Sequence, residues 1–277
     1  MQFRDKFLDL SISRVMGILN VTPDSFSDGG AFNMLENGLS QAALMLTEGA
    51  DIIDIGGEST RPGAQAVTVQ QELDRVIPMI ELIFKRFDTI ISIDTSKAQV
   101  MAEAVSAGAS LINDVRALQE NGALDAAVVA NVPVCLMHMQ GQPRIMQQNP
   151  RYDDVVKDVM SFLRQRISTC HQAGIAKEQI IVDPGFGFGK SIEHNYQMLA
   201  NLEKFHQLKV PVLAGMSRKS MLGNLLQREI EQRLAGNIAV AVVAVQKGAQ
   251  IIRVHDVKET VDAVKIVKMI NACRDNN

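Results

Sequence analysis

One stretch of the chain, IIVDPGFGFGKS at residues 180–191, has the composition of a phosphate-binding loop. A P-loop surrounds phosphate with backbone N–H groups only when four residues separate its first glycine from Gly-Lys-Ser/Thr. Counting back from Gly189 reaches Pro184, and starting from Gly185 leaves only three residues between. The dinucleotide-binding pattern needs a glycine where Lys190 stands. Both nucleotide motifs therefore fail by one residue, although the glycines still indicate a sharp turn or a close backbone approach.

Polar or ionisable residues end the short aliphatic runs that recur along the chain. They are Asn20, Asp54, Asp94, Asn113, His138, Asp183, Ser217 with Lys219, and Arg253 with His255. In a barrel of βα units, the carboxyl ends of the strands and the loops after them form one mouth, where active sites lie. We therefore expect these side chains to converge on one pocket. For any single residue the alternative stays open that it meets solvent or caps the next helix.

The acidic and amide members of this set suit a flat ligand. Asp94, Asn113 and Asp183 offer carboxylate and amide groups close to the barrel axis. A carboxylate can accept two parallel N–H bonds from a guanidine-like N–C–N edge. The sequence therefore predicts a pocket for a planar ring that carries N–H donors and ring acceptors.

The basic members predict an anion site beside that pocket. Arg253 and His255 are two residues apart on a predicted strand, so their side chains point to the same face. With Lys219, and with Arg61 from a nearby loop, they can form a positive rim. The alternative for Arg253 and Lys219 is a salt bridge with the barrel acids.

Two long glycine-rich segments, at residues 20–30 and 56–63, follow the first two predicted strands. Loops of this length in a compact barrel are more often functional than decorative. Phe26 and Pro62, together with Thr60, can close over a substrate and exclude water. The alternative is that these side chains only pack their own loops.

Composition excludes several other classes of function. A net charge of −3 provides no basic field for nucleic acid, so we expect no nucleic-acid partner. The N-terminus has no signal-peptide pattern, and the longest apolar run, 238–245, is too short to span a bilayer. We therefore expect a cytoplasmic protein without a membrane segment. Three distant cysteines and five unpaired histidines indicate no disulfide framework and no tight zinc site.

The elements that must position these residues alternate regularly between strand and helix. The predicted strands are 15–20, 51–57, 90–95, 110–115, 132–138, 180–185, 210–216 and 250–255, and clear amphipathic helices cover 68–86, 97–108, 152–174 and 229–248. Alternation of this kind is typical of a parallel sheet built from βα units. We predict a single α/β domain over residues 1–277, a (β/α)8 TIM barrel with its active site at the C-terminal ends of the strands.

Local signals mark where several helices begin and end. Gly49, Gly108 and Gly248 follow predicted helices, where glycine readily takes the left-handed conformation that ends a helix. Ser96 with Gln99 has the spacing of a capping box before the helix at 97–108. Lys190 and Ser191 are expected to begin the helix after the glycine-rich loop.

With these residues in place, the chain resembles the bacterial dihydropteroate synthase family, the folate-pathway enzymes that sulfonamides inhibit. The segments NVTPDSFSDGG, GGESTRPG, SIDTSK, INDV, DPGFGFGK, GMSRKS and RVHDV are similar to the motifs of that family, in the same order. Each motif alone is weak evidence, whereas seven in order are specific. The resemblance extends from about residue 14 to residue 268.

The resemblance implies a pterin-binding transferase that joins 6-hydroxymethyl-7,8-dihydropterin diphosphate to p-aminobenzoate. The implied catalytic residues are Asp94, Lys219, Arg253 and His255. Those implied for the pterin are Asp94, Asn113, Met137, Asp183, Lys219 and Arg253. The diphosphate is assigned to Asn20, Thr60, Arg61, Arg253 and His255, and p-aminobenzoate to Phe26, Thr60, Pro62, Phe188 and Ser217. The resemblance further implies Mg²⁺ at Asn20 and a homodimer.

This chemistry needs no enzyme nucleophile. Loss of diphosphate from the methylene leaves positive charge on the dihydropterin, which Asp94 can stabilise, while Mg²⁺, Arg253 and His255 stabilise the leaving group. We therefore expect a dissociative substitution. Two alternatives stay open, a pterin-dependent methyltransferase barrel and a pterin-binding protein without catalysis. The first has no need for the Arg253 and His255 pair.

Overall fold

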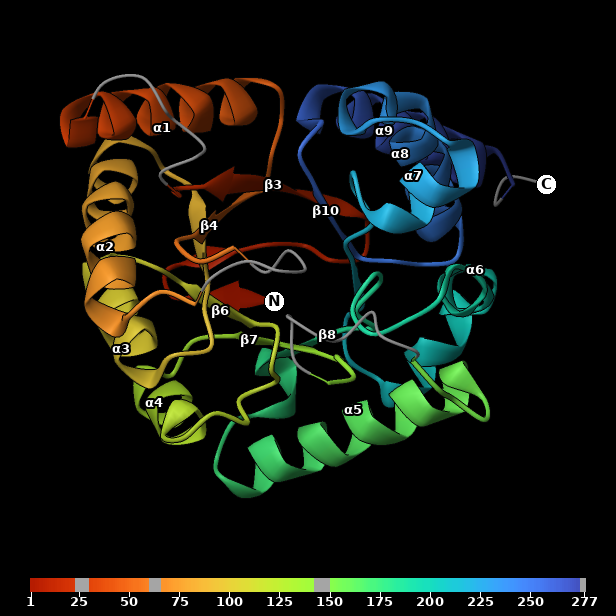
Figure 1. The fold of residues 1–277 in the computed structure, drawn as a ribbon, viewed down its shortest axis with the longest axis horizontal. Coiled ribbons are helices and arrows are strands. Elements are labelled where there is room, and N and C mark those ends of the chain that lie inside the picture. Colours follow the sequence, from red (N-terminus) through yellow and green to blue (C-terminus); the bar gives the residue numbers. More distant parts are fainter. Residues whose placement is uncertain (23–29, 60–65, 142–149, 275–277) are drawn as a thin grey trace.

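The computed structural model describes residues 1–22, 30–59, 66–141 and 150–274. Its central sheet has eight parallel strands surrounded by helices (Figure 1). The strands are β3 Arg14–Asn20, β4 Ile52–Gly56, β5 Ile90–Asp94, β6 Leu111–Asp114, β7 Val134–Met137, β8 Ile180–Asp183, β9 Leu213–Ala214 and β10 Ile251–Val254. They are hydrogen-bonded in the order β8-β7-β6-β5-β4-β3-β10-β9, and a parallel bridge between Val182 and Val212 joins the two ends. The predicted (β/α)8 barrel is confirmed.

The helices follow the strands in the expected alternation. They are α1 Gly30–Thr47, α2 Val69–Arg86, α3 Ala98–Ala107, α4 Ala123–Ala130, α5 Val155–Gln172, α6 Ile192–Ala200, α7 Ser220–Leu226, α8 Leu234–Gln246 and α9 Val257–Arg274, with short 3₁₀ turns at η2 Lys177–Gln179, η3 Leu202–Leu208 and η4 Ile230–Gln232. A small N-terminal hairpin pairs β1 Gln2–Phe3 with β2 Lys6–Phe7. That residues 1–277 form a single domain stays a prediction.

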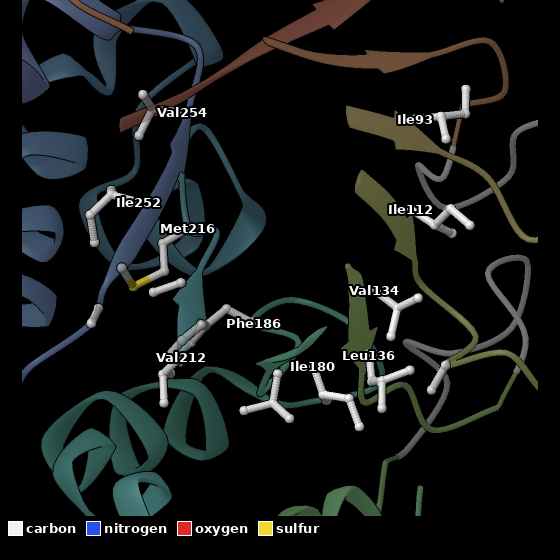
Figure 2. Packing of buried hydrophobic residues seen from close by; sticks show 14 of the residues in the cluster. Ile93, Ile112, Val134, Leu136, Ile180, Phe186, Val212, Met216, Ile252 and Val254 are labelled. Atoms are coloured by element: carbon white, nitrogen blue, oxygen red, sulfur yellow. The ribbon is translucent and has the colours of Figure 1, made fainter. Parts of the chain in front are cut away.

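The period-two alternation of the strands separates the helix-facing core from the barrel interior. Outward side chains such as Ile112, Val134 and Ile252 pack against the helices, on the outer side of the strands (Figure 2). Inward side chains near the strand starts form a second apolar cluster, which the hairpin residue Phe3 joins at the barrel's N-terminal end. This cluster consists of Phe3, Leu8, Met16, Ile52, Ile90, Leu111, Cys135, Ile181, Leu213 and Ile251.

On five of the strands the side chain two residues further along is polar. Asp54 follows Ile52, Ser92 follows Ile90, Asn113 follows Leu111, Asp183 follows Ile181 and Arg253 follows Ile251, whereas on β7 Met137 follows Cys135. Because residues i and i+2 of a strand share a face, these side chains also point into the barrel. The same alternation that builds the apolar floor therefore places the polar residues directly above it.

Several strand and helix boundaries differ from the predictions. β9 contains only two residues, against the predicted 210–216, and it is preceded by Pro211, which has no N–H to donate, and by the isolated bridge at Val212. The predicted capping box at Ser96 is wrong. The residue before α3 is Lys97, which makes no side-chain cap, and the Ser96 hydroxyl donates to Asp114 instead. The predicted helix 229–248 is divided at Arg233, with η4 before it and α8 after it.

Other local predictions are confirmed. Gly49, Gly108 and Gly248 all have positive φ, at 100°, 130° and 88°. Ser191 is the N-cap of α6 and accepts a hydrogen bond from the backbone N–H of His194. Within the described residues, no helix has both the length and the apolar character needed to cross a membrane. The cytoplasmic location and the absence of a nucleic-acid partner stay predictions.

Candidate active site

Arg253 lies at the centre of the polar interior and contacts two carboxylates. Its Nε donates to Asp54 Oδ2 at 2.6 Å, and its Nη2 donates to Asp94 Oδ2 at 2.7 Å. Asp54 is fully buried and Asp94 nearly so, with 0% and 13% of the two side chains exposed. The alternative interpretation of Arg253, a salt bridge with the barrel acids, describes its contacts in this structure. Although burial opposes charge, Asp54 and Asp94 raise the pKa of Arg253 overall.

Asp94 differs from an ordinary aspartate because it is enclosed among other acids. Burial raises its pKa to about 7, against the opposing charge of Arg253 and with a further increase from Asp54. Its carboxyl group therefore changes protonation near neutral pH. When it is deprotonated, this carboxylate places a negative charge beside the Arg253 guanidinium, where the surrounding protein screens it less than bulk water would.

Asn113 is turned towards the same acid pair. Its Nδ2 lies 3.3 and 3.5 Å from the two carboxylate oxygens of Asp54, and the side chain is buried. Since Nδ2 of Asn113 donates to Asp54, its amide oxygen Oδ1 points away from Asp54 and is the atom that can accept a hydrogen bond from a ligand. Asp54 thus sets the orientation of both Arg253 and Asn113.

Asp183 and Lys219 form the other half of the site. Asp183 Oδ1 accepts the backbone N–H of Gly185 at 2.7 Å, and burial raises its pKa against the opposing charge of Lys219. Lys219 Nζ donates to the carbonyl of Phe186 at 2.6 Å and lies 4.5 Å from the centre of the Phe188 ring. Burial lowers the pKa of Lys219 to about 8, while Asp183 opposes that shift.

An apolar patch and a polar pair complete the described part of the mouth. Met137 and Phe188 pack together with Val115 as a separate buried cluster. Ser217 Oγ lies 3.0 Å from His255 Nδ1 and also accepts the His255 backbone N–H at 3.2 Å. The Met137 and Phe188 side chains thus form an apolar wall near the charged groups of the site. This combination of apolar and charged lining is usual for a small-molecule site.

Asn20 is the one metal-binding residue that the resemblance implies. A Cβ atom added to Gly56 would lie 3.8 Å from Asn20 Oδ1 and 3.9 Å from Asp94 Oδ2, so both oxygens border the same glycine at the mouth. Within the described ranges, no group of three or more His, Cys, Asp or Glu side chains could hold a metal ion. An amide oxygen next to a carboxylate still suits Mg²⁺, which usually keeps several waters and takes its other ligands from substrate phosphates.

The glycine-rich loop at 185–189 does not present N–H groups to a phosphate. Gly185 and Gly189 have φ of 73° and 63°. A Cβ atom at Gly185 would lie 1.9 Å from the carbonyl oxygen of His138, and one at Gly189 would lie 2.4 Å from that of Gln140. The glycines therefore allow the loop to pack against the chain that follows β7. Two carbonyls of the loop, those of Gly185 and Phe188, accept hydrogen bonds from the buried amine of Lys190.

The structure brings most of the predicted residues together. Asp94, Asn113, Asp183, Lys219 and Arg253 share the polar interior, with Met137 and Phe188 in the apolar patch. Ser217 and His255 pair with each other, and Asn20 borders Gly56. The predicted residues Phe26, Thr60, Arg61 and Pro62 lie outside the described residues.

Two residues with extensive contacts, Asp54 and Lys190, are not among the predicted site residues. Asp54 is predicted only as a strand-end acid, yet its spacing two residues after Ile52 already indicates the barrel interior. Lys190 is predicted only to begin a helix, and no sequence signal indicates that its side chain turns inward. The ring and the backbone carbonyl of the strand-end residue His138 both contact the Lys190 amine.

Comparisons with known proteins agree on one group. A family model described as "Pterin binding enzyme" matches residues 16–255. Dihydropteroate synthase from Escherichia coli (strain K12) is 56% identical over 97% of this chain and 95% of that protein. A crystal structure of the Yersinia pestis enzyme with a sulfonamide drug complex has a TM-score of 0.94 and 57% identity, covering 98% of this chain and 99% of the other. The Xanthomonas albilineans enzyme with 4-aminobenzoic acid has a TM-score of 0.91 and 52% identity, covering 96% and 95%.

Proposed function

The chain belongs to the dihydropteroate synthase family of pterin-binding enzymes, and we propose that its buried acid–base cluster performs the family reaction by a dissociative route. The enzyme is a transferase of folate synthesis, and the reaction joins 6-hydroxymethyl-7,8-dihydropterin diphosphate to p-aminobenzoate. The observation that carries the proposed route is the paired arrangement of Arg253 with Asp54 and Asp94, beside Asp183 and Lys219.

The pterin ring is proposed to enter the polar interior with its guanidine-like edge leading. The carboxylate of Asp183 can accept the two N–H groups of the ring's guanidine-like edge. Asn113 presents its amide oxygen from the opposite side, since its Nδ2 is held by Asp54. Lys219 can donate to the ring carbonyl, and Met137 offers an apolar surface to the ring face.

The chemical step is proposed to begin with loss of the leaving group. The bond between the methylene carbon and the diphosphate oxygen breaks, and its electron pair leaves with the diphosphate. Positive charge spreads from the methylene into the dihydropterin ring, where the deprotonated carboxylate of Asp94 stabilises it. The amine nitrogen of p-aminobenzoate then forms the new C–N bond and loses one proton, so no covalent enzyme intermediate arises.

Asn20 is proposed to hold Mg²⁺ together with the substrate diphosphate. When bound, the ion would neutralise negative charge on the leaving group. His255 lies on the same face of the chain as Arg253, and its side chain is partly exposed, so it can contact the anion.

Phe188 and Ser217 are proposed to contact p-aminobenzoate, as are Phe26, Thr60 and Pro62. Thr60 and Arg61 are further proposed for the diphosphate.

The alternatives that the sequence left open are less well supported. A pterin-dependent methyltransferase would also use the acidic and amide side chains that face the pterin edge. However, the proteins compared above are dihydropteroate synthases, and the match covers nearly the whole length of both chains. A protein that binds pterin without catalysis would not require the ion pair between the enclosed Asp94 side chain and Arg253.

A direct assay tests the proposed function. Purified protein is mixed with Mg²⁺ and both substrates, and released diphosphate and dihydropteroate are measured. We expect equal amounts of the two products and turnover that depends on p-aminobenzoate. No diphosphate release under these conditions would exclude the proposed transferase reaction, and diphosphate release without dihydropteroate formation when both substrates are present would exclude p-aminobenzoate as the acceptor.

We predict that Asp183→Ala weakens pterin binding. A hydrogen bond to a charged group contributes about 1.5–3 kcal/mol, so the dissociation constant should rise about tenfold to a hundredfold. Isothermal titration with a pterin measures the effect, and Asp183→Asn serves as a matched variant that keeps the shape but not the charge. Unchanged affinity in both variants would remove Asp183 from the pterin site.

We predict a bell-shaped pH profile of kcat/KM. Asp94 is charged only above its pKa of about 7, and Lys219 is charged only below its pKa of about 8. Since both charges are needed, activity should rise with pH through the first value and fall through the second. Initial rates between about pH 5 and pH 10 measure the profile. Asp94→Asn should remove the rising limb, and a rising limb that persists in that variant would assign it to another group.

The homodimer remains part of the proposal. Apolar side chains are exposed on the α7–α8 region and on α9, which is unusual for a surface that meets only water. They are Leu225, Leu226, Ile230, Leu234, Ile266, Met269 and Ile270. A second copy of the chain is the proposed partner of these helices.

A further inference from the structure

The amine of Lys190 is enclosed by the backbone of the glycine-rich loop. Only 2% of this residue is exposed. Nζ donates to the carbonyl of Gly185 at 2.8 Å, to that of Phe188 at 3.0 Å and to that of His138 at 3.3 Å. A buried lysine is tolerated only when its donors are satisfied, and here the satisfying groups are main-chain carbonyls.

His138 closes the remaining side of this enclosure. Its Nδ1 lies 3.0 Å from Lys190 Nζ. Burial, and next the charge of Lys190, lowers the pKa of His138 to about 3, so the ring is neutral, and its Nδ1 shares the three N–H groups of Lys190 with the three carbonyls. His138 also stacks edge-on against Phe162, with ring centres 4.9 Å apart. The amine thus joins the loop after β8 to the segment after β7.

The loop that Lys190 holds also touches the described site at three points. The N–H of Gly185 binds Asp183, the carbonyl of Phe186 accepts the amine of Lys219, and the Phe188 ring packs under that same amine. The loop therefore sets the position of one carboxylate, one ammonium group and one apolar wall. Moving the loop would displace all three together.

The contacts of Lys190 differ from those of Lys219. The Lys190 amine is buried and donates to main-chain carbonyls, whereas the Lys219 amine also lies 4.5 Å from the centre of the Phe188 ring. A second group also holds the loop, since Asn195 accepts the N–H of Gly187 and donates to the Lys190 carbonyl. Asn195 contacts the outer part of the loop, and Lys190 fills its centre.

We propose that Lys190 is a positioning residue for the transferase reaction. Its amine draws the loop carbonyls around itself and so fixes the geometry of Asp183, Lys219 and Phe188. Two carbonyls of the glycine-rich loop then surround an internal amine, together with the carbonyl of His138, in place of N–H groups around a phosphate. The kinetic part of this inference rests on the proposed function, and the geometric part does not.

The test compares Lys190→Met with Tyr152→Phe. Methionine keeps the length and apolar stem of the side chain but has no donor. The matched control removes a single bond to the same loop, since the Tyr152 hydroxyl donates to the carbonyl of Gly189 at 2.7 Å. For Lys190→Met we expect kcat/KM to fall about a hundredfold, because a displacement of about 1 Å at reacting groups can cost that much. Tyr152→Phe should stay within about threefold.

Hydrogen exchange without substrate supplies a readout that is independent of activity. In Lys190→Met the amides of Gly185 and Gly187 should exchange at least about tenfold faster, while amides of the barrel strands remain protected. Lys190→Gln, which keeps N–H donors, should recover part of both the protection and kcat/KM. If Lys190→Met does not fold, Lys190→Gln is compared with wild type on the same two measurements.

Three outcomes would overturn the inference. The first is a Lys190→Met variant with wild-type loop exchange and kcat/KM. The second is a uniform loss of protection over the whole barrel, which would make the residue merely structural. The third is Lys190→Gln behaving no better than Lys190→Met. A wild-type enzyme that forms no product would instead refute the proposed function, and the exchange measurement would still test the loop.

Discussion

Asp94→Asn is expected to lower kcat by about 10²–10³-fold, the cost that removal of one preorganised electrostatic group typically has. Asn keeps the size and one oxygen of the side chain but loses the charge that stabilises the dihydropterin cation. Only 13% of the Asp94 side chain is exposed and it lies 2.7 Å from Arg253 Nη2, so water replaces the missing charge poorly. Steady-state kinetics with both substrates measures the change.

The same variant separates transition-state stabilisation from substrate binding. If Asp94 acts mainly on the developing cation, kcat and kcat/KM should fall together while the pterin dissociation constant changes by less than about fivefold. Asp183→Asn provides the matched comparison, because there the loss should appear in binding. An Asp94→Asn enzyme with wild-type kcat and weakened pterin binding would reduce Asp94 to a binding residue and remove the support for a dissociative step.

The fold could be predicted because its signal is local and periodic. Ile52 and Asp54, or Leu111 and Asn113, show the two-residue step from apolar floor to polar interior directly in the sequence. The meeting of strand ends at one mouth follows from parallel topology alone. For these reasons the amino-acid sequence is sufficient to group Asp94, Asn113, Asp183 and Arg253.

The pairing inside that group could not be predicted, because it depends on register between strands far apart in the chain. Arg253 reaches Asp54 and Asp94 across the closed barrel, at sequence separations of 199 and 159 residues. The predicted anion rim and the salt bridge were equally consistent with the spacing of Arg253 and His255. The structure shows the guanidinium directed at the two acids.

Short-range signals also failed where a tertiary partner competed for a side chain. Ser96 has the spacing of a cap, yet Asp114 lies within reach and accepts its hydroxyl. Lys190 follows a Gly-rich run that suggests phosphate, yet the positive φ of the glycines turns the carbonyls onto its amine. In both cases the side chain forms a hydrogen bond with a partner that is distant in the sequence or in the loop fold, instead of the contact that the local motif predicts.

Arg253→Met is expected to destabilise the fold by about 3–5 kcal/mol, the cost of breaking a buried ion pair by removing one partner. Methionine fills a similar volume without charge, so among the described residues the Asn113 amide would be the donor left to the buried Asp54 carboxylate. Chemical denaturation followed by far-UV circular dichroism measures the free energy of unfolding. Activity should be lost as well, since Asp94 would be protonated more readily without the guanidinium.

A double-mutant cycle with Asp54→Asn decides whether the loss comes from the stranded carboxylate. Asp54→Asn alone removes one partner of Arg253, but Asp94 can still pair with it. In the Arg253→Met background, Asp54→Asn removes the uncompensated charge and should restore about half of the lost stability, because two neutral groups in the interior cost less than one unpaired ion. Arg218→Met is the control, because the Arg218 side chain is 39% exposed, so solvent screens its pair with Asp256 and the loss should stay below about 1 kcal/mol. Strictly additive effects of Arg253→Met and Asp54→Asn on the free energy of unfolding would show that the two side chains do not stabilise each other. The positions of the cluster residues would then be set by the strands alone.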